Sequence, residues 1–199
     1  MAYAVTSDIH AYGNIPTSDT SDDAYFSLLI GRATTAIDQY TGRKFETSSD
    51  AEVARYYSPD DVDGLLLYLD EDLAQIITVT VGSDSVTSTD YFVIPRNAKP
   101  YYALRLKDNS PRDWGAGDSD GEYHDSIVVT GQWGYSTTAP ADIKHATCRL
   151  VRWMFEMGRI NPQEDRPIVL ESGTTILPGR MPNDVTSILD RYKKVNVHG

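Results

Sequence analysis

The clearest hydrophobic pattern in the chain is helical and lies in residues 21–45. Apolar side chains recur there at intervals of three and four residues, which places them on one arc of a helix. The residues on this arc are Tyr25, Phe26, Leu29, Ile30, Ala33, Ala36, Ile37 and Tyr40. Ser21 is placed to cap the start of the helix, and Gly42 can adopt the left-handed conformation that ends it. The pattern therefore predicts an amphipathic packing helix.

Beyond residue 51 the pattern changes to short runs that alternate apolar and polar side chains or are rich in β-branched ones. Turn-forming Gly, Asp, Pro and Ser separate the runs. The runs cover residues 53–57, 65–69, 76–81, 91–94, 101–106 and 126–132. About six strands at short spacing predict an antiparallel β-subdomain of sandwich or small-barrel type.

A second long helix is predicted from residue 139 or 140 to about residue 157, with Gly158 as its stop. Its apolar arc contains Val151 and is widened by Cys148 and Phe155. This arc is wider than one core face needs, so we expect the helix to pack centrally or to touch another subunit as well as its own core.

Two further segments near the C-terminus are apolar. A long connection without periodicity, residues 161–181, holds one group formed by Ile168, Val169 and Leu170 and another formed by Ile176 and Leu177. A short last helix, residues 183–193, has a narrow apolar stripe of Val185, Ile188, Leu189 and Tyr192. A helix of this length is marginal alone, so we expect it to dock on its own core or on a partner.

The order of these elements predicts an α+β fold in two parts. Residues 1–48 and 137–199 form an α-helical core with two long helices and the short C-terminal helix, and residues 49–136 form an inserted antiparallel β-subdomain.

Charge and composition narrow the possible partners. The formal net charge of −11 opposes attraction to phosphate backbones and to anionic membranes. The single cysteine, Cys148, excludes an internal disulfide bond. The first residues show no signal-peptide pattern, and no window approaches the ~20 apolar residues that span a membrane.

Candidate chemistry is weak throughout the chain. The acidic stretches 60–64 and 118–125 resemble calcium loops, but their glycines come too early for an EF-hand. His145 and Cys148 offer two ligands where a zinc site needs three or four. We predict no catalytic residue, no metal site and no cofactor. The alternative is a calcium- or carbohydrate-binding β-module without catalysis.

Three stretches resemble, in their order and spacing, the head-tail connector (adaptor) proteins of long-tailed bacteriophages. The first is the helix of residues 29–45, which ends in YTGRKF. The second is LYLDEDL at residues 67–73 with the following run to residue 81, and the third is WGYS at residues 133–136 followed by the helix that carries Trp153. The resemblance spans residues 21–158, and the remainder is similar in layout only.

The resemblance implies a structural virion protein without enzymatic activity, assembled in the host cytoplasm and located in the neck. Such adaptors form a ring, typically twelve-fold, beneath the portal protein; they extend the DNA channel and dock the tail terminator or stopper protein. DNA passes without specific binding, we expect acidic faces to line the channel, and no membrane is involved. A ring needs two different patches on each subunit. We expect Val151, Phe155, Ile168, Val169, Leu170, Ile176 and Leu177 to form the subunit interface. We expect Val185, Ile188, Leu189 and Tyr192 to dock on the portal.

Overall fold

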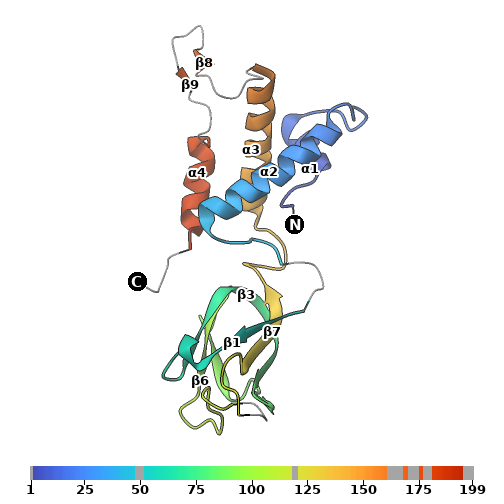
Figure 1. Ribbon diagram of the computed structural model, residues 1–199. Coiled ribbons are helices and arrows are strands. Elements are labelled where there is room, and N and C mark those ends of the chain that lie inside the picture. Colours follow the sequence, from blue (N-terminus) through green and yellow to red (C-terminus); the bar gives the residue numbers. More distant parts are fainter. Residues whose placement is uncertain are drawn as a thin grey trace. The chain divides into compact units, whose positions relative to one another are not determined.

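The computed structural model describes residues 2–47, 52–117, 121–160, 168–169, 175–176 and 181–194 (Figure 1). The chain is α+β, as predicted, and it divides into two compact units. The first, called here the α unit, comprises Met1–Arg43 and Ala139–Gly199; the second, the β unit, comprises Lys44–Thr138.

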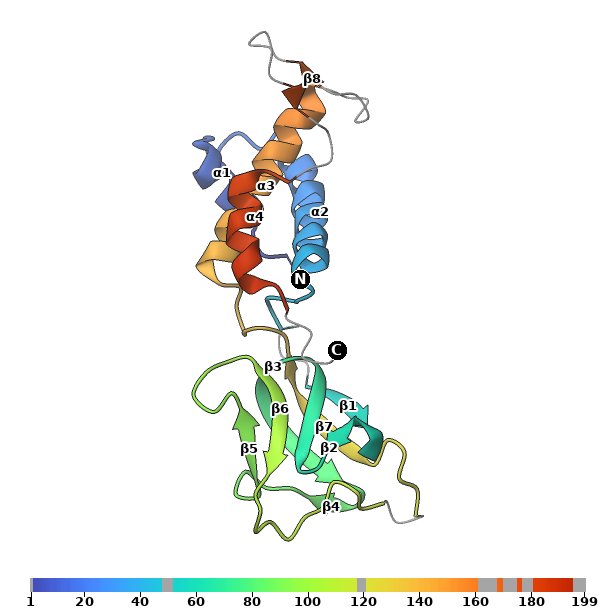
Figure 2. The same cartoon turned by 90° about the vertical axis from the view of Figure 1, so that its left-hand side faces the viewer.

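The α unit consists of helices that pack around α3. Its elements are α1 (Thr6–Gly13), α2 (Asp23–Thr41), α3 (Ala141–Ile160), the small strands β8 (Ile168–Val169) and β9 (Thr175–Ile176), α4 (Asn183–Leu189) and the 3-10 turn η2 (Asp190–Tyr192). Helix α3 packs against α1, α2 and α4, and Figures 1 and 2 show these helices side by side. No helix in the described ranges has the length and apolar character needed to cross a membrane.

The ends of the two long helices differ in how well the sequence predicts them. Gly42 adopts φ 67° and donates its N–H to the carbonyl of Asp38, which confirms it as the stop of α2. Gly158 does not stop α3, which continues to Ile160, so that prediction was wrong. A Cβ at residue 158 would lie 2.9 Å from the hydroxyl of Tyr25. The glycine therefore allows α2 and α3 to approach closely instead of ending the helix.

The β unit is built on one curved antiparallel sheet. Its elements are β1 (Val53–Tyr57), η1 (Pro59–Asp61), β2 (Val62–Asp63), β3 (Leu66–Val81), β4 (Asp84–Ser85), β5 (Tyr91–Ile94), β6 (Tyr101–Leu106) and β7 (Ile127–Trp133). The strand order is β1-β7-β3-β6-β5, and β2 and β4 both pair with β3. The first half of β3 pairs with β6 and the second half pairs with β7.

Strand β3 joins two runs that the sequence pattern predicts as separate strands. The acidic stretch between the runs remains in strand conformation. Its charges are met by β1, because the Arg55 guanidinium contacts the carboxylates of Asp70 and Glu71 and the Tyr57 hydroxyl donates to Asp70 at 2.6 Å. Burial, and then the neighbouring Asp70 carboxylate, raise the pKa of Tyr57.

Two tryptophans close the core of the β unit. The loop of residues 108–122 reads as exposed in the sequence, yet its Trp114 is 1% exposed and its indole N–H donates to the carbonyl of Leu65 at 2.8 Å. The Trp133 indole donates to the carbonyl of Val53 at 2.8 Å, and the Arg55 guanidinium lies 4.4 Å from the centre of the Trp133 ring. Trp114 therefore anchors this loop in the core of the β unit.

Candidate assembly surfaces

The interior of the α unit contains the two α3 residues that we expected at a subunit interface. Val151 is fully buried and Phe155 is 6% exposed. The Phe155 ring lies 4.9 Å from the ring of Phe26 and 5.8 Å from that of Tyr25, and the Arg159 guanidinium lies 5.4 Å from its centre. Both residues therefore have a packing role within the subunit, and a role between subunits stays a prediction.

The apolar groups of the long connection lie partly in a small strand pair. Ile168 is opposite Ile176, and Val169 is opposite Thr175, in the antiparallel pair β8–β9. Leu170 and Leu177 lie outside the described residues. The predicted interface in this segment stays a prediction.

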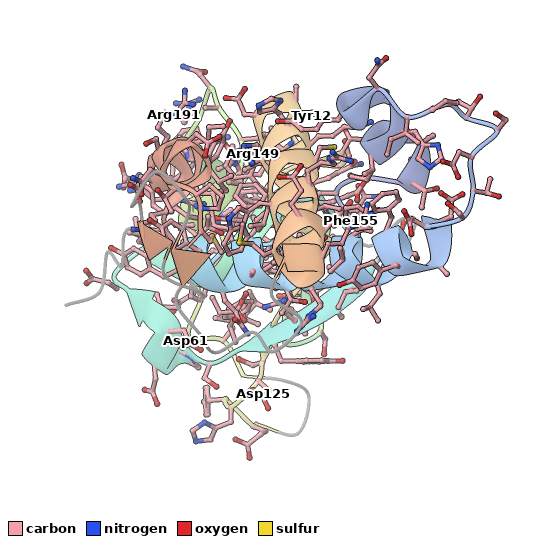
Figure 3. The ribbon with its side chains drawn as sticks, turned by 90° about the horizontal axis from the view of Figure 1, so that it is seen from above. Tyr12, Asp61, Asp125, Arg149, Phe155 and Arg191 are labelled. Carbon is pink, nitrogen blue, oxygen red and sulfur yellow. The ribbon has the colours of Figure 1, made fainter. Side chains whose placement is uncertain are left out.

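Helix α4 docks on its own unit. Val185 and Leu189 are fully buried, whereas Ile188 and Tyr192 are half-buried. The side chain of Arg149, which lies between α3 and α4 in Figure 3, pairs with Asp184 at 2.8 Å. Two of the four residues that we expected to dock on the portal, Val185 and Leu189, are therefore already covered inside the subunit.

The turn η2 is held to the end of α2 by three further contacts. The Tyr40 hydroxyl donates to Asp190 at 2.7 Å, the Arg43 side chain donates to the carbonyl of Tyr192 at 2.7 Å, and the N–H of Lys194 donates to the carbonyl of Thr41 at 2.8 Å. The ammonium of Lys193, and then the Tyr40 hydroxyl, lower the pKa of Asp190.

An outward apolar strip on α2 was missed by the sequence analysis. Leu28 is 57% exposed and Tyr25 is 39% exposed, although the sequence pattern places Tyr25 on the core arc. Gly31 follows three residues later, and a Cβ added there would meet no other segment or side chain within 4 Å. These residues are three apart, so they share one face of the helix. The signal that could have found the strip is Leu28 itself, a large apolar residue outside the main stripe.

Metal-ligating side chains are not gathered in the described part of the chain. No three His, Cys, Asp or Glu residues within those ranges come together in a way that could hold a metal ion. His145 contacts the Tyr12 ring edge-on at 5.5 Å, and Cys148 is buried. Residues 118–120 of the second acidic loop lie outside the described ranges.

The described residues gather no metal site, and the outward side chains of Tyr25 and Leu28 are a candidate surface for contact with another chain. The sequence model of the head completion protein family matches residues 5–195, and the chain belongs to that family. The match confirms the resemblance to phage head-tail connector proteins.

Two solved structures share the fold. A chain in the neck of an empty GTA particle, computed with C6 symmetry, superposes with a TM-score of 0.59 at 16% identity over 98% of this chain and 91% of that one. A chain in the neck of a native GTA particle, computed with C12 symmetry, gives a TM-score of 0.55 at 15% identity over 92% of this chain and 91% of that one. No curated protein matches the sequence.

Proposed function

We propose that this chain is a structural protein of the virion neck, located where the head of a phage or phage-like particle meets its tail. The observation that carries this proposal is the head completion family match over residues 5–195. The fold shared with chains from the necks of GTA particles supports it. In this role the chain contributes surfaces and no catalysis, and we assign it no catalytic residue and no cofactor.

The chain forms a ring in this proposal. The two similar necks were computed with C6 and with C12 symmetry, which supports a closed ring, and twelve copies is the number we propose. A ring is generated by two different patches on each subunit. The α2 strip of Tyr25, Leu28 and Gly31 is one candidate patch, because an exposed apolar strip is stabilised when a neighbour covers it. The segment that contains β8 and β9 is a second.

The ring sits beneath the portal protein and carries the tail terminator or stopper in this proposal. Its channel passes DNA without specific binding, and the net charge of −11 supports a wall that repels phosphates. The portal contact uses the exposed side of α4 and η2, including Ile188 and Tyr192, because Val185 and Leu189 are buried in the subunit.

The proposal is tested by producing particles without this chain and then supplying variants. We expect filled heads without tails in its absence, and rings of this chain in necks purified from complete particles. Leu28→Glu should lower the yield of tailed particles at least tenfold while leaving the circular dichroism of the purified chain unchanged. Ser27→Glu is the matched control, because Ser27 is exposed about 100° away on the same helix. Tailed, infectious particles that lack the chain would refute the role.

A further inference from the structure

A groove of about 450 Å³ in the β unit gathers positive charge in an acidic chain. The hairpin β5–β6 forms most of it and β3 contributes Gln75 and Ile76. Its charged lining residues are Arg96, Lys99 and Lys107, and no carboxylate lines it. With a formal net charge of −11 for the chain, three cations without an acid are a local reversal of sign.

The cationic side chains of the groove lie against aromatic rings. The Arg96 guanidinium lies 4.0 Å and the Lys107 ammonium 5.0 Å from the centre of the Phe92 ring, and the Lys99 ammonium lies 5.9 Å from the centre of the Tyr101 ring. Arg96 and Lys99 are exposed, and neither forms an ion pair with another residue in the described ranges. Lys107 differs from them, because its ammonium donates to the backbone carbonyl of Thr89. Two of the three charges are therefore available to an incoming anion.

The opposite edge of the same sheet carries exposed acids. Strand β1 lies at the far end of the strand order from β5, and the turn after β1 exposes Asp60, Asp61 and Asp63. The segments of β5 and β2 lie on different sides of the β unit in Figure 2.

This turn has a fixed shape. The Asp61 carboxylate accepts the N–H of Ser58 at 2.9 Å, and the Ser58 hydroxyl accepts the N–H of Asp125 at 3.0 Å. Asp125 is exposed, so its carboxylate adds to the same acidic surface, and Figure 3 shows Asp61 and Asp125 at the same end of the view. The turn therefore presents carboxylates without needing to become ordered on binding.

We propose that the groove of one copy receives the acidic turn, residues 58–63, of the next copy of this chain. Arg96 and Lys99 then face Asp60 and Asp61 across the contact. The inference rests on the proposed ring, because a contact between two different edges of one sheet is heterologous and can close into a ring. Charge complementarity of this kind fixes the partner and the register more than it adds affinity.

Nucleic acid is the competing occupant, and two observations disfavour it. Arg96 and Lys107 already lie against the Phe92 ring, which leaves less of its face for a base to stack on. The net charge of −11 also repels a long polyanion before it reaches the groove. A short acidic turn with a fixed shape meets neither obstacle to the same degree.

Charge reversal with rescue tests the proposal in particle assembly. The double variant Arg96→Glu/Lys99→Glu and the double variant Asp60→Lys/Asp61→Lys should each lower the yield of tailed particles at least tenfold. Their combination in one chain should restore the yield to within about threefold of wild type. Arg105→Glu is the matched control, because Arg105 lies on β6, pairs with Asp108 and does not line the groove.

Two further measurements separate the possible failures. Lys99→Glu alone, checked by circular dichroism, guards against misfolding of the double variant. If wild-type necks contain rings of this chain and none of the charge reversals lowers the yield of tailed particles, the proposed contact is wrong and the neck role stands. If the necks lack this chain, the neck role itself is wrong. If Arg96→Glu/Lys99→Glu assembles normally but loses binding to a short DNA duplex, the occupant is nucleic acid and the proposal is wrong.

Discussion

Gly131 in β7 offers the sharpest test of how the β unit is held together. It lies opposite Val53 of β1 on one side and Ile76 of β3 on the other, so β7 has a paired strand on each side at this residue. A Cβ at this position would lie 2.4 Å from the carbonyl oxygen of Gln75 and 2.6 Å from a methyl carbon of Leu73. Leu73 is fully buried, so it has no solvent to move into. The substitution Gly131→Ala therefore forces β7 and β3 apart.

The expected cost follows from these contacts. Non-bonded atoms prefer separations of about 3.5 Å or more, so the strand must retreat by about 1 Å. Inserting a methyl group into a filled core costs about 1–3 kcal/mol. Each weakened ladder hydrogen bond adds about 1 kcal/mol. We expect a loss of about 3 kcal/mol or more, which lowers the melting temperature of a unit of this size by roughly 12 °C or more.

The assay is urea denaturation followed by tryptophan fluorescence and circular dichroism. Gly31→Ala in α2 is the matched control, because the space at that position is open to 4 Å and alanine is favoured in a helix by about 1 kcal/mol. The same chemical change should therefore destabilise the chain at residue 131 and leave it unchanged or stabilise it at residue 31. A Gly131→Ala variant within about 0.5 kcal/mol of wild type would refute the strand packing described here.

Three other changes test the α unit. Phe155→Ala should cost about 3–5 kcal/mol of unfolding free energy by denaturant titration, because it removes a buried ring packed at 4.9 Å on Phe26; a loss under about 1 kcal/mol would contradict that burial. By NMR, the Asp190 carboxyl should titrate below its ordinary pKa of 3.8, because Lys193 favours the charged form of Asp190. The stability that this ion pair contributes should be present at neutral pH and disappear as the pH falls through the lowered pKa. An unshifted titration midpoint would contradict the ion pair. Burial, and then the charge of Asp8, raise the pKa of the Cys148 thiol to about 11. At pH 8 a thiol reagent should therefore react with Cys148 only as fast as the chain unfolds. Rapid reaction of the native protein would disprove the burial of Cys148.

Elements with a strong local period were predictable from the sequence. Five of the eight members of the predicted arc, Phe26, Leu29, Ile30, Ala33 and Ile37, are buried in α2, whereas Tyr25 is exposed. Strands β5 and β6 have the bounds that the pattern predicts. In each case the residue's own neighbours along the chain carry the information, because one face of a helix or strand must be apolar to be buried.

Elements that depend on distant partners were not predictable. The acidic stretch of β3 reads as a break between strands, and it stays extended because Arg55, about 15 residues earlier, neutralises Asp70 and Glu71. Trp114 reads as part of an exposed loop, and it is buried because the carbonyl of Leu65 accepts its indole N–H. Arg55 and Asp70 lie 15 residues apart and Trp114 and Leu65 lie 49 apart, on different elements, so the periodicity of one element does not reveal either contact.

The candidate surfaces show the same limit. The stripe of Val185 and Leu189 correctly indicates that α4 must bury one face, but the sequence does not say against what, and the structure fills that need within the α unit. Leu28 was overlooked because it lies outside the periodic stripe, and for that reason it remains exposed. For this reason we propose Leu28, an apolar residue that breaks the period, as a candidate interface residue ahead of those that obey it.

The charge of the chain constrains how copies of it can meet. Identical subunits with a net charge of −11 repel one another, and at physiological salt this repulsion is screened beyond about 8 Å. A stable ring therefore needs contacts in which the sign is reversed locally or charge is absent. In the ring proposed above, the groove with Arg96 and Lys99 is the candidate for the first kind of contact in the β unit, and the α2 strip with Leu28 is the candidate for the second kind in the α unit. Moderate salt should thus relieve the general repulsion and favour ring assembly, whereas high salt should weaken the groove contact and leave the apolar contact in place.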